Sequence, residues 1–128
     1  TKSFVEVISN SCNPAFIQIG QMLGAGKFRQ YYQVFGFSDK TGIDLPGEAE
    51  DSFWKEGKMG GVDLAVASFG QNFTITPIQM ITACAAVSNG GYVVQPHVVS
   101  KITDSKGNVI KTVDKKVKRQ VISDDTSK

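Results

Sequence analysis

The sequence contains little cysteine and histidine, and their scarcity excludes several kinds of site. Its 128 residues include two cysteines, Cys12 and Cys84, and one histidine, His97. The cysteines lack C-x-x-C spacing and no histidines cluster near them, so the sequence predicts neither a metal site nor a cofactor. We expect the cysteines to be small buried residues, and the sequence leaves a disulfide between them open.

Long apolar runs and a charge of one sign are also missing. No apolar stretch approaches the roughly 18 residues of a membrane span and no signal sequence is evident, so we expect no membrane contact from these residues. The formal net charge is only +2, and the cations crowd into the last quarter of the chain among acidic residues. Without a basic stripe, nucleic acid binding has little support. The 41% of hydrophobic residues is typical of a folded globular chain.

Helical patterns fill the first part of the chain. Apolar residues recur at helical spacing in residues 4–8, and a second helix is predicted to begin with Asn13 as its cap and Pro14 at its first position. We expect that helix to end at Gly24, with four side chains available to a core: Phe16, Ile17, Met22 and Leu23. Aromatic residues at helical spacing predict a third helix, and we interpret them as core: Phe28, Tyr31, Tyr32 and Phe35.

Residues 36–61 show no periodicity. Gly, Pro, Asp and Ser dominate there, which predicts a long ordered loop. Loops of this length within a compact domain are usually functional or held by their neighbours. We expect Phe53 and Trp54 to hold this one against the rest of the chain.

The clearest helix start in the chain lies at residue 76. After a short helical pattern over residues 63–69, Thr76 provides a cap, Pro77 suits the first helical position, and Gln79 can reach back to the cap. Residues 80–87 are nearly all small or apolar. We therefore expect this helix to be buried on most of its surface.

Alternation replaces helical spacing after residue 91. Strands are predicted over residues 92–94, 98–102 and 109–113, with a turn between the last two, and together they form a β-hairpin. Residues 115–121 are predicted to be an edge strand whose lysines discourage pairing with other chains. Ser123 and the two aspartates after it predict the start of a helix that is cut off, so we expect the chain to stop within a domain.

Ser11 and Asn13 stand two residues apart in the predicted joint between two helices, which would fix both side chains. Three further segments follow in order: Gly42-Ile43-Asp44-Leu45-Pro46-Gly47-Glu48, Gly70-Gln71, and Thr76-Pro77-Ile78-Gln79-Met80. Together they resemble the transpeptidase domain of class B penicillin-binding proteins, the sporulation-specific type among them, over about residues 1–97. In that family S-x-N is the second of three active-site motifs, after S-x-x-K and before K-T-G.

The resemblance implies a fold. The chain would be mainly α with a C-terminal β-hairpin, as a partial domain of the α/β penicillin-binding protein transpeptidase fold, which is β-lactamase-like. Residues 1–91 would be the mainly helical portion and residues 92–122 the hairpin and edge strand. Residues 123–128 would begin a truncated helix.

The resemblance also implies an activity and a set of site residues. Ser11 would relay a proton, and Asn13 would hold the motif lysine and a substrate amide, while Cys12, Gly70 and Gln71 would lie in the substrate cleft. The intact enzyme would take peptidoglycan stem peptides and β-lactams by serine acyl transfer, at the extracytoplasmic face of the bacterial membrane. Its anchor and its nucleophile would lie outside this chain, and the isolated piece is expected to be inactive and to form a homodimer.

Two segments match the other family motifs only by accident. Ser52-Phe53-Trp54-Lys55 fits S-x-x-K, but it follows S-x-N in the sequence and precedes a glycine-rich, poor helix. Lys40-Thr41-Gly42 fits K-T-G, yet it leads into a loop where the family has a strand. The family usually has a glycine where Asn72 stands, and Asn tolerates a positive φ. His97 is interpreted as a surface or packing residue.

A rival reading treats the chain as an independent helical module that binds a peptide or a protein without catalysis. Ser11 and Asn13 would then serve only to cap a helix. The flanking sequence discriminates the two readings, because the enzyme requires a true S-x-x-K before this chain and a true K-T-G after it.

Overall fold

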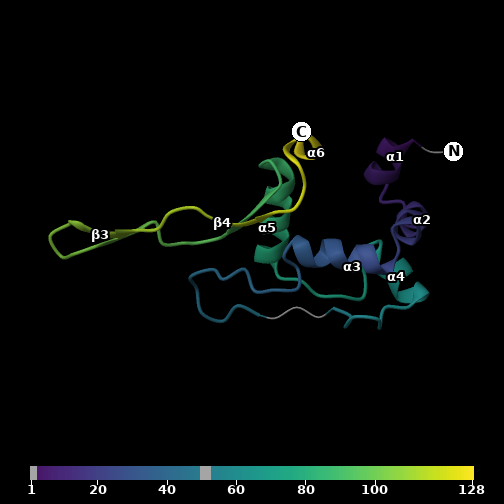
Figure 1. The fold of residues 1–128 in the computed structure, drawn as a ribbon, viewed down its shortest axis with the longest axis horizontal. Coiled ribbons are helices and arrows are strands. Elements are labelled where there is room, and N and C mark those ends of the chain that lie inside the picture. Colours follow the sequence, from purple (N-terminus) through teal and green to yellow (C-terminus); the bar gives the residue numbers. More distant parts are fainter. Residues whose placement is uncertain (1–2, 50–52) are drawn as a thin grey trace. The chain divides into compact units, whose positions relative to one another are not determined.

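The computed structural model describes residues 3–49 and 53–128, which divide into two compact units (Figure 1). The first unit comprises residues 3–32 and 53–74, and the second comprises residues 33–49 and 75–128. Each unit is built from two stretches of chain that lie far apart in the sequence. Within the described residues, no helix is long and apolar enough to cross a membrane.

The first unit is helical, as predicted. It holds α1 (Phe4–Ser9), α2 (Asn13–Leu23), most of α3 (Ala25–Val34) and α4 (Gly61–Ala67). A capping box starts α1, because the Ser3 hydroxyl accepts from Glu6 N–H and the Glu6 carboxylate accepts from Ser3 N–H. The core prediction for α2 is wrong for Met22, which is 87% exposed. Residue 22 is rotated by about 200° around the helix from buried Gly20, so Met22 lies on the opposite side.

Gly20 allows α2 and α4 to pack closely. It is the buried residue of α2, and a Cβ added to it would lie 1.8 Å from Ser68 Oγ. The Ser68 hydroxyl is already committed, since it donates to the Leu64 carbonyl at 2.6 Å. Any larger residue at position 20 would force the two helices apart.

An aromatic cluster fastens the end of the long loop to α3, which confirms the role predicted for Phe53 and Trp54. The Phe53 ring stacks on Tyr32 with a centroid distance of 3.6 Å, and Phe73 meets Tyr32 edge-on at 5.6 Å. Arg29 donates to the Trp54 carbonyl. The prediction that the whole aromatic stripe is core holds for buried Tyr32 but is wrong for Tyr31, which is 47% exposed.

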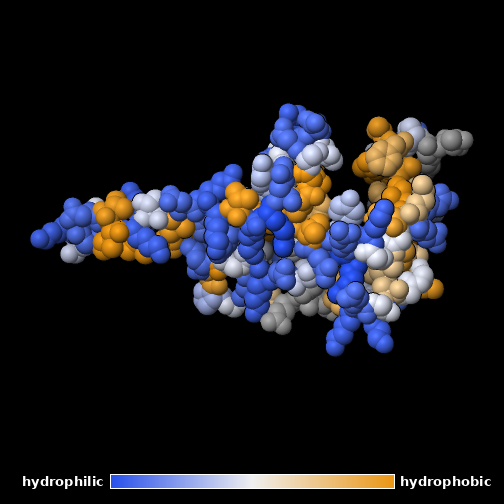
Figure 2. All heavy atoms as spheres, viewed as in Figure 1, coloured by the Kyte–Doolittle hydropathy of each residue, from blue (hydrophilic) through white to orange (hydrophobic). Residues whose placement is uncertain are grey.

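The second unit is organised around α5 (Pro77–Ser88), which starts with the predicted capping box of Thr76 and Gln79. One face of α5 is buried, and its buried residues are Gln79, Thr82, Ala83 and Ala86. The prediction of burial over most of the helix is wrong, because the opposite face leaves Met80, Ile81 and Val87 46–64% exposed. Figure 2 shows apolar atoms at the surface along this helix and along the strands that follow it.

Four strands form one long hairpin with two ladders. β1 (Tyr92–Gln95) pairs antiparallel with β4 (Lys116–Gln120), and β2 (Lys101–Thr103) pairs antiparallel with β3 (Val109–Thr112). The β2–β3 hairpin confirms the predicted hairpin, but its first strand begins at Lys101, so the strand predicted for residues 98–100 is wrong. The edge strand expected over residues 115–121 has the partner β1, because the chain doubles back along its whole length.

The chain ends in a short helix, α6 (Asp124–Ser127), capped by Ser123 as predicted. The Ser127 hydroxyl donates to the Val87 carbonyl and accepts from Gly90 N–H, so α6 lies against the end of α5. Both cysteines are free thiols. The expectation of burial is wrong for Cys84, which is exposed on α5, whereas Cys12 is half-buried.

Candidate active site

The predicted joint between the first two helices is closed by a paired hydrogen-bond motif. Ser11 N–H donates to the Ile8 carbonyl and Cys12 N–H donates to the Val7 carbonyl, both at 3.0 Å. These two bonds define the Schellman motif, which satisfies the last carbonyl groups of a helix. The motif requires a left-handed residue at its turning point, and Ser11 fills that position with φ +47°.

A serine at this position is unusual in this chain as well as in general. The end of α4 has the same bond pattern, with Gly70 N–H bonded to Ala67 and Gln71 N–H to Val66, and there the turning residue is Gly70 at φ +84°. Glycine adopts a positive φ without the steric cost that a Cβ imposes. The α1 end therefore carries a strained residue where a glycine would terminate the helix equally well, and strain of this kind concentrates at functional sites.

Asn13 does not cap α2, so the predicted cap is wrong. The cap residue is Cys12, whose carbonyl accepts from Ala15 and Phe16 N–H and whose own side chain forms no cap hydrogen bond. Asn13 is already the first helical residue, which places Pro14 one position later than expected. Cys12 therefore belongs to both helix ends, since its N–H closes α1 and its carbonyl begins α2.

The side chains of Ser11 and Asn13 are therefore available for chemistry. Both residues are exposed, and within the described part of the chain neither side chain forms a hydrogen bond. Their neighbours Ser9 and Asn10, by contrast, donate to the Glu6 carbonyl. The backbone of the joint therefore holds two polar side chains that have no partner among the described residues. The Ser11 hydroxyl can donate and accept, and the Asn13 amide has two donors and an acceptor.

The remaining predicted site residues lie in the same unit. Cys12 shares the joint with Ser11 and Asn13, while Gly70 and Gln71 form the exposed turn after α4. Helix α2 meets α4 at Gly20 and Ser68, about 10 Å along the helix axis from Asn13 at 1.5 Å per residue. Among the described residues, no hydrogen bond joins the joint to the Gly70 turn. Asn72 adopts φ +65°, which confirms that asparagine can support the turn.

The accidental K-T-G segment is occupied by structural bonds. Thr41 is 5% exposed, lies outside every strand, and gives both its N–H and its hydroxyl to the Glu48 carboxylate at 2.6 and 2.5 Å. Gly42 N–H donates to the same carboxylate at 3.0 Å. Burial raises the pKa of Glu48, but the Thr41 hydroxyl and the two N–H donors outweigh it and hold that pKa below its ordinary value.

Two other sequence interpretations are resolved in part. Ser52 lies outside the described residues, so the accidental S-x-x-K has no structural account. His97 is exposed, with its Nδ1 2.9 Å from the Val99 carbonyl oxygen. That contact places His97 in a local backbone turn, in keeping with a packing role.

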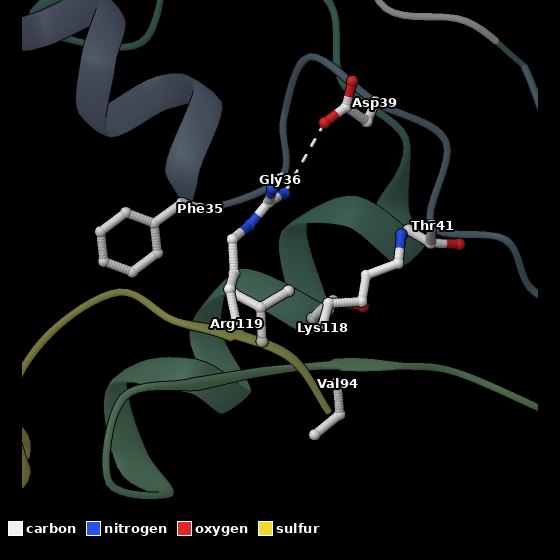
Figure 3. A pocket seen from close by; sticks show the side chains of 9 residues that line it. Phe35, Gly36, Asp39, Thr41, Val94, Lys118 and Arg119 are labelled. Carbon is white, nitrogen blue, oxygen red and sulfur yellow. Dashed lines mark ion pairs between the residues drawn. The ribbon is translucent and has the colours of Figure 1, made fainter. Parts of the chain in front are cut away.

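Sequence reasoning missed a hollow in the second unit where two consecutive cations face the loop after α3 (Figure 3). Arg119 Nη2 lies 3.7 Å from Asp39 Oδ2, and Lys118 Nζ donates to the Lys40 carbonyl at 3.1 Å. Neighbouring residues of a regular strand point to opposite faces. Here the register of β1 and β4 shifts between Val93 and Val94, and this bulge turns both cations to one side. No pattern in the sequence marks the bulge.

Comparison with known proteins identifies the family. The model of the penicillin binding protein transpeptidase domain matches residues 1–128. Stage V sporulation protein D of Bacillus subtilis is 41% identical over 99% of this chain, and the chain spans 20% of that relative. Peptidoglycan D,D-transpeptidase MrdA of Acinetobacter baumannii is 38% identical over 73% of the chain, which corresponds to 15% of its own length.

Solved structures show the same fold. PBPA from Mycobacterium tuberculosis superposes with a TM-score of 0.85 at 25% identity, over 98% of this chain and 29% of its own. A ceftriaxone acyl-enzyme complex of penicillin-binding protein A from M. tuberculosis gives a TM-score of 0.81 at 26% identity, over 98% and 28% of the two chains. The chain thus spans less than a third of each of these four proteins. Its mostly helical fold with a small antiparallel sheet is part of a penicillin-binding protein transpeptidase domain.

Proposed function

This chain belongs to the penicillin-binding protein transpeptidase family, and from that membership we propose that it supplies the S-x-N part of the active site of a peptidoglycan D,D-transpeptidase. The observation that carries the proposal is Ser11, a non-glycine residue at φ +47° whose hydroxyl has no internal partner among the described residues. A strained backbone combined with an unused polar group is expected where a side chain is retained for its chemistry.

The reaction is acyl transfer in two steps. A serine attacks the D-alanyl-D-alanine bond of a stem peptide, forms an ester and releases D-alanine, and the amine of a neighbouring stem peptide then displaces the serine to form the cross-link. β-Lactams acylate the same serine, in line with the acyl-enzyme complex known for the M. tuberculosis relative. The serine and its lysine lie outside this chain, and the reaction takes place at the extracytoplasmic face of a membrane to which the whole protein is anchored.

Ser11 and Asn13 have separate roles in this reaction. The Ser11 hydroxyl accepts a proton from one partner as it donates its own, so it relays a proton between the nucleophile's lysine and the leaving amine. The Asn13 amide holds that lysine through its oxygen and donates to the substrate amide through its nitrogen. Cys12, Gly70 and Gln71 line the substrate cleft beside them.

The test is acylation of the full-length protein by a fluorescent penicillin. Ser11→Ala is expected to slow acylation by about a hundredfold or more, the usual range for a lost proton-transfer group. Asn13→Ala is expected to slow it as well, because the variant loses the hydrogen bonds to the lysine and to the substrate amide. Ser9→Ala and Asn10→Ala are matched controls, because the same residue types stand beside the joint with their side chains bonded to the Glu6 carbonyl. Rates that fall equally in all four variants, together with the melting temperature, would show that the joint is structural.

We also propose that the 128-residue chain on its own takes no covalent penicillin and forms a homodimer. The exposed face of α5 and the strand edges over residues 109–121 present apolar side chains that association would cover: Met80, Ile81, Val87, Val109, Ile110 and Val117. Light scattering across a tenfold dilution tests this association. A monomer at every concentration would contradict it and would leave the proposed reaction of the whole protein untouched.

A further inference from the structure

The long hairpin of the second unit is interrupted between its two ladders. The β1–β4 ladder ends with Gln95 opposite Lys116, and the β2–β3 ladder begins with Lys101 opposite Thr112. Val113 N–H donates to the Ser100 carbonyl at 2.9 Å, and no other backbone bond crosses the interruption in the described chain. We call residues 101–112, which hold β2, β3 and the turn between them, the arm.

A carboxylate takes the place of a strand partner at this interruption. Asp44 Oδ1 accepts from Val98 N–H at 2.7 Å, and Asp44 Oδ2 accepts from Val99 N–H at 2.9 Å. The Val98 bond and then the Val99 bond lower the pKa of Asp44, so the carboxylate is charged at neutral pH. One side chain therefore holds two adjacent backbone donors through charge-assisted hydrogen bonds.

Asp44 belongs to a segment that is itself held firmly. We call residues 37–48 the strap. Buried Gln79 of α5 donates through Nε2 to the carbonyls of Phe37 and Asp39 at 3.2 and 3.0 Å, which anchors the start of the strap. Glu48 folds back onto Thr41 and Gly42 and closes its end. The Asp44 carboxylate is thus presented from a rigid loop.

The strap also bonds to the β1–β4 ladder, which lies before the interruption. Gln95 Nε2 donates to the Gly42 carbonyl at 2.5 Å, and the β4 bulge directs Lys118 to the Lys40 carbonyl and Arg119 to Asp39 (Figure 3). The β1–β4 ladder is therefore fixed to the strap at several points. The far side of the interruption is held by Asp44 and by the Val113 to Ser100 bond.

The arm beyond the interruption is rigid within itself. At its tip, Asp104 Oδ1 accepts from Lys106 and Asn108 N–H at 2.8 and 2.9 Å, which closes the turn between β2 and β3. Its two strands otherwise contact each other, and their residues are exposed. A rigid rod joined through an unpaired segment turns about that segment unless something holds it.

We propose that residues 96–100 and 113–115 form a hinge for the β2–β3 hairpin and that Asp44 is the latch that sets the direction of the arm. The latch lies in the second unit alone, so this inference stands independently of the proposed acyl transfer. With the latch closed, the exposed apolar side chains of the arm, among them Ile102 and Ile110, are presented in one fixed direction.

The test measures arm motion in the full-length protein. Asp44→Asn retains the size of the side chain but removes its charge and one acceptor, so deuterium exchange in peptides covering residues 96–100 is expected to rise about tenfold. Spin labels on Cys84 and on a cysteine introduced by Lys106→Cys, with other reactive thiols removed, should give a broader distance distribution in the Asp44→Asn variant.

Asp114→Asn is the matched control. Asp114 stands in the opposite segment of the same interruption, is exposed, and forms no hydrogen bond among the described residues, so both measurements should stay at the parent value. Exchange over residues 77–88 reports whether α5 stays folded. If Asp44→Asn raises exchange there as well, Asp44→Glu replaces it, because the longer side chain keeps the charge while displacing the carboxylate. An unchanged distance distribution in a folded Asp44 variant would overturn the proposal.

Discussion

The ends of α1 and α4 share one backbone design and differ in the residue at its turning point. Both ends close with the same pair of hydrogen bonds, yet α4 turns at Gly70 and α1 turns at Ser11. A residue with a Cβ in the left-handed region costs roughly 1 kcal/mol or more relative to glycine. Helix termination therefore explains Gly70 fully and Ser11 only in part, because termination alone favours glycine, which adopts a positive φ without a steric cost.

The sharpest way to break this comparison is Ser11→Gly. The substitution removes the hydroxyl and the strain together, so acylation of the full-length protein by penicillin should fall by about a hundredfold or more while its melting temperature stays the same or rises. Stopped-flow acylation and thermal melting measure the two effects on one preparation. If the glycine variant acylates at the parent rate, the Ser11 hydroxyl has no part in acylation and Ser11 only terminates α1.

The end of α5 shows the cost of a side chain one position after the turning residue. The residue after its turning point is Gly91, where α1 has Cys12, and a Cβ at Gly91 would lie 2.0 Å from the Ile122 carbonyl oxygen. Because that neighbour is backbone and φ is +88°, Gly91→Ala should cost about 3 kcal/mol. Thermal melting checks this, and a loss below about 1 kcal/mol would mean that the chain around Ile122 shifts easily.

Gly70→Ser provides the reciprocal substitution at α4. Among residues 3–49 and 53–128, no atom lies within 4 Å of a Cβ built at Gly70, so the only cost expected for a serine there is its positive φ. We expect the free energy of unfolding to fall by about 1 kcal/mol, and this value measures directly how much the positive φ of Ser11 destabilises the protein. The measurement is again thermal melting, with Gly107→Ser as the control, since that turn glycine also has open space and a positive φ.

Sequence patterns predicted the elements well because end signals act locally. The Thr76 to Gln79 capping box, the Ser123 cap and the turn at Asn72 depend on residues a few positions apart, and the structure has all three. Burial was predicted less well: Met22 and much of α5 are exposed. Hydrophobic spacing shows which face of a helix is apolar, but it does not show whether a neighbour from the same 128 residues covers that face.

The candidate site divides in the same way. The family motifs pointed to Ser11 and Asn13. Their side chains are free of internal bonds among the described residues because backbone hydrogen bonds close the helix joint, and no sequence pattern shows those bonds. The Asp44 bonds and the Lys118 bond to the Lys40 carbonyl connect residues 54 to 78 positions apart, and the bulge at Lys118 shifts a strand register by one residue. Long-range pairings of this kind follow from the three-dimensional fold.

The starts of α2 and α5 give the smallest and most direct test of how the joint works. Thr76 caps α5 through its hydroxyl, which accepts from Gln79 N–H at 3.2 Å, whereas the Cys12 side chain at the start of α2 forms no cap hydrogen bond. Thr76→Ala should therefore cost about 1 kcal/mol, the usual value of a lost cap, and Asn13→Ala should change stability by less than about 0.5 kcal/mol. Melting temperatures of the two variants in the full-length protein make the comparison. A loss at Asn13 as large as that at Thr76 would show that the amide stabilises the helix start after all, and the case for a side chain kept for substrate would then rest on Ser11 alone.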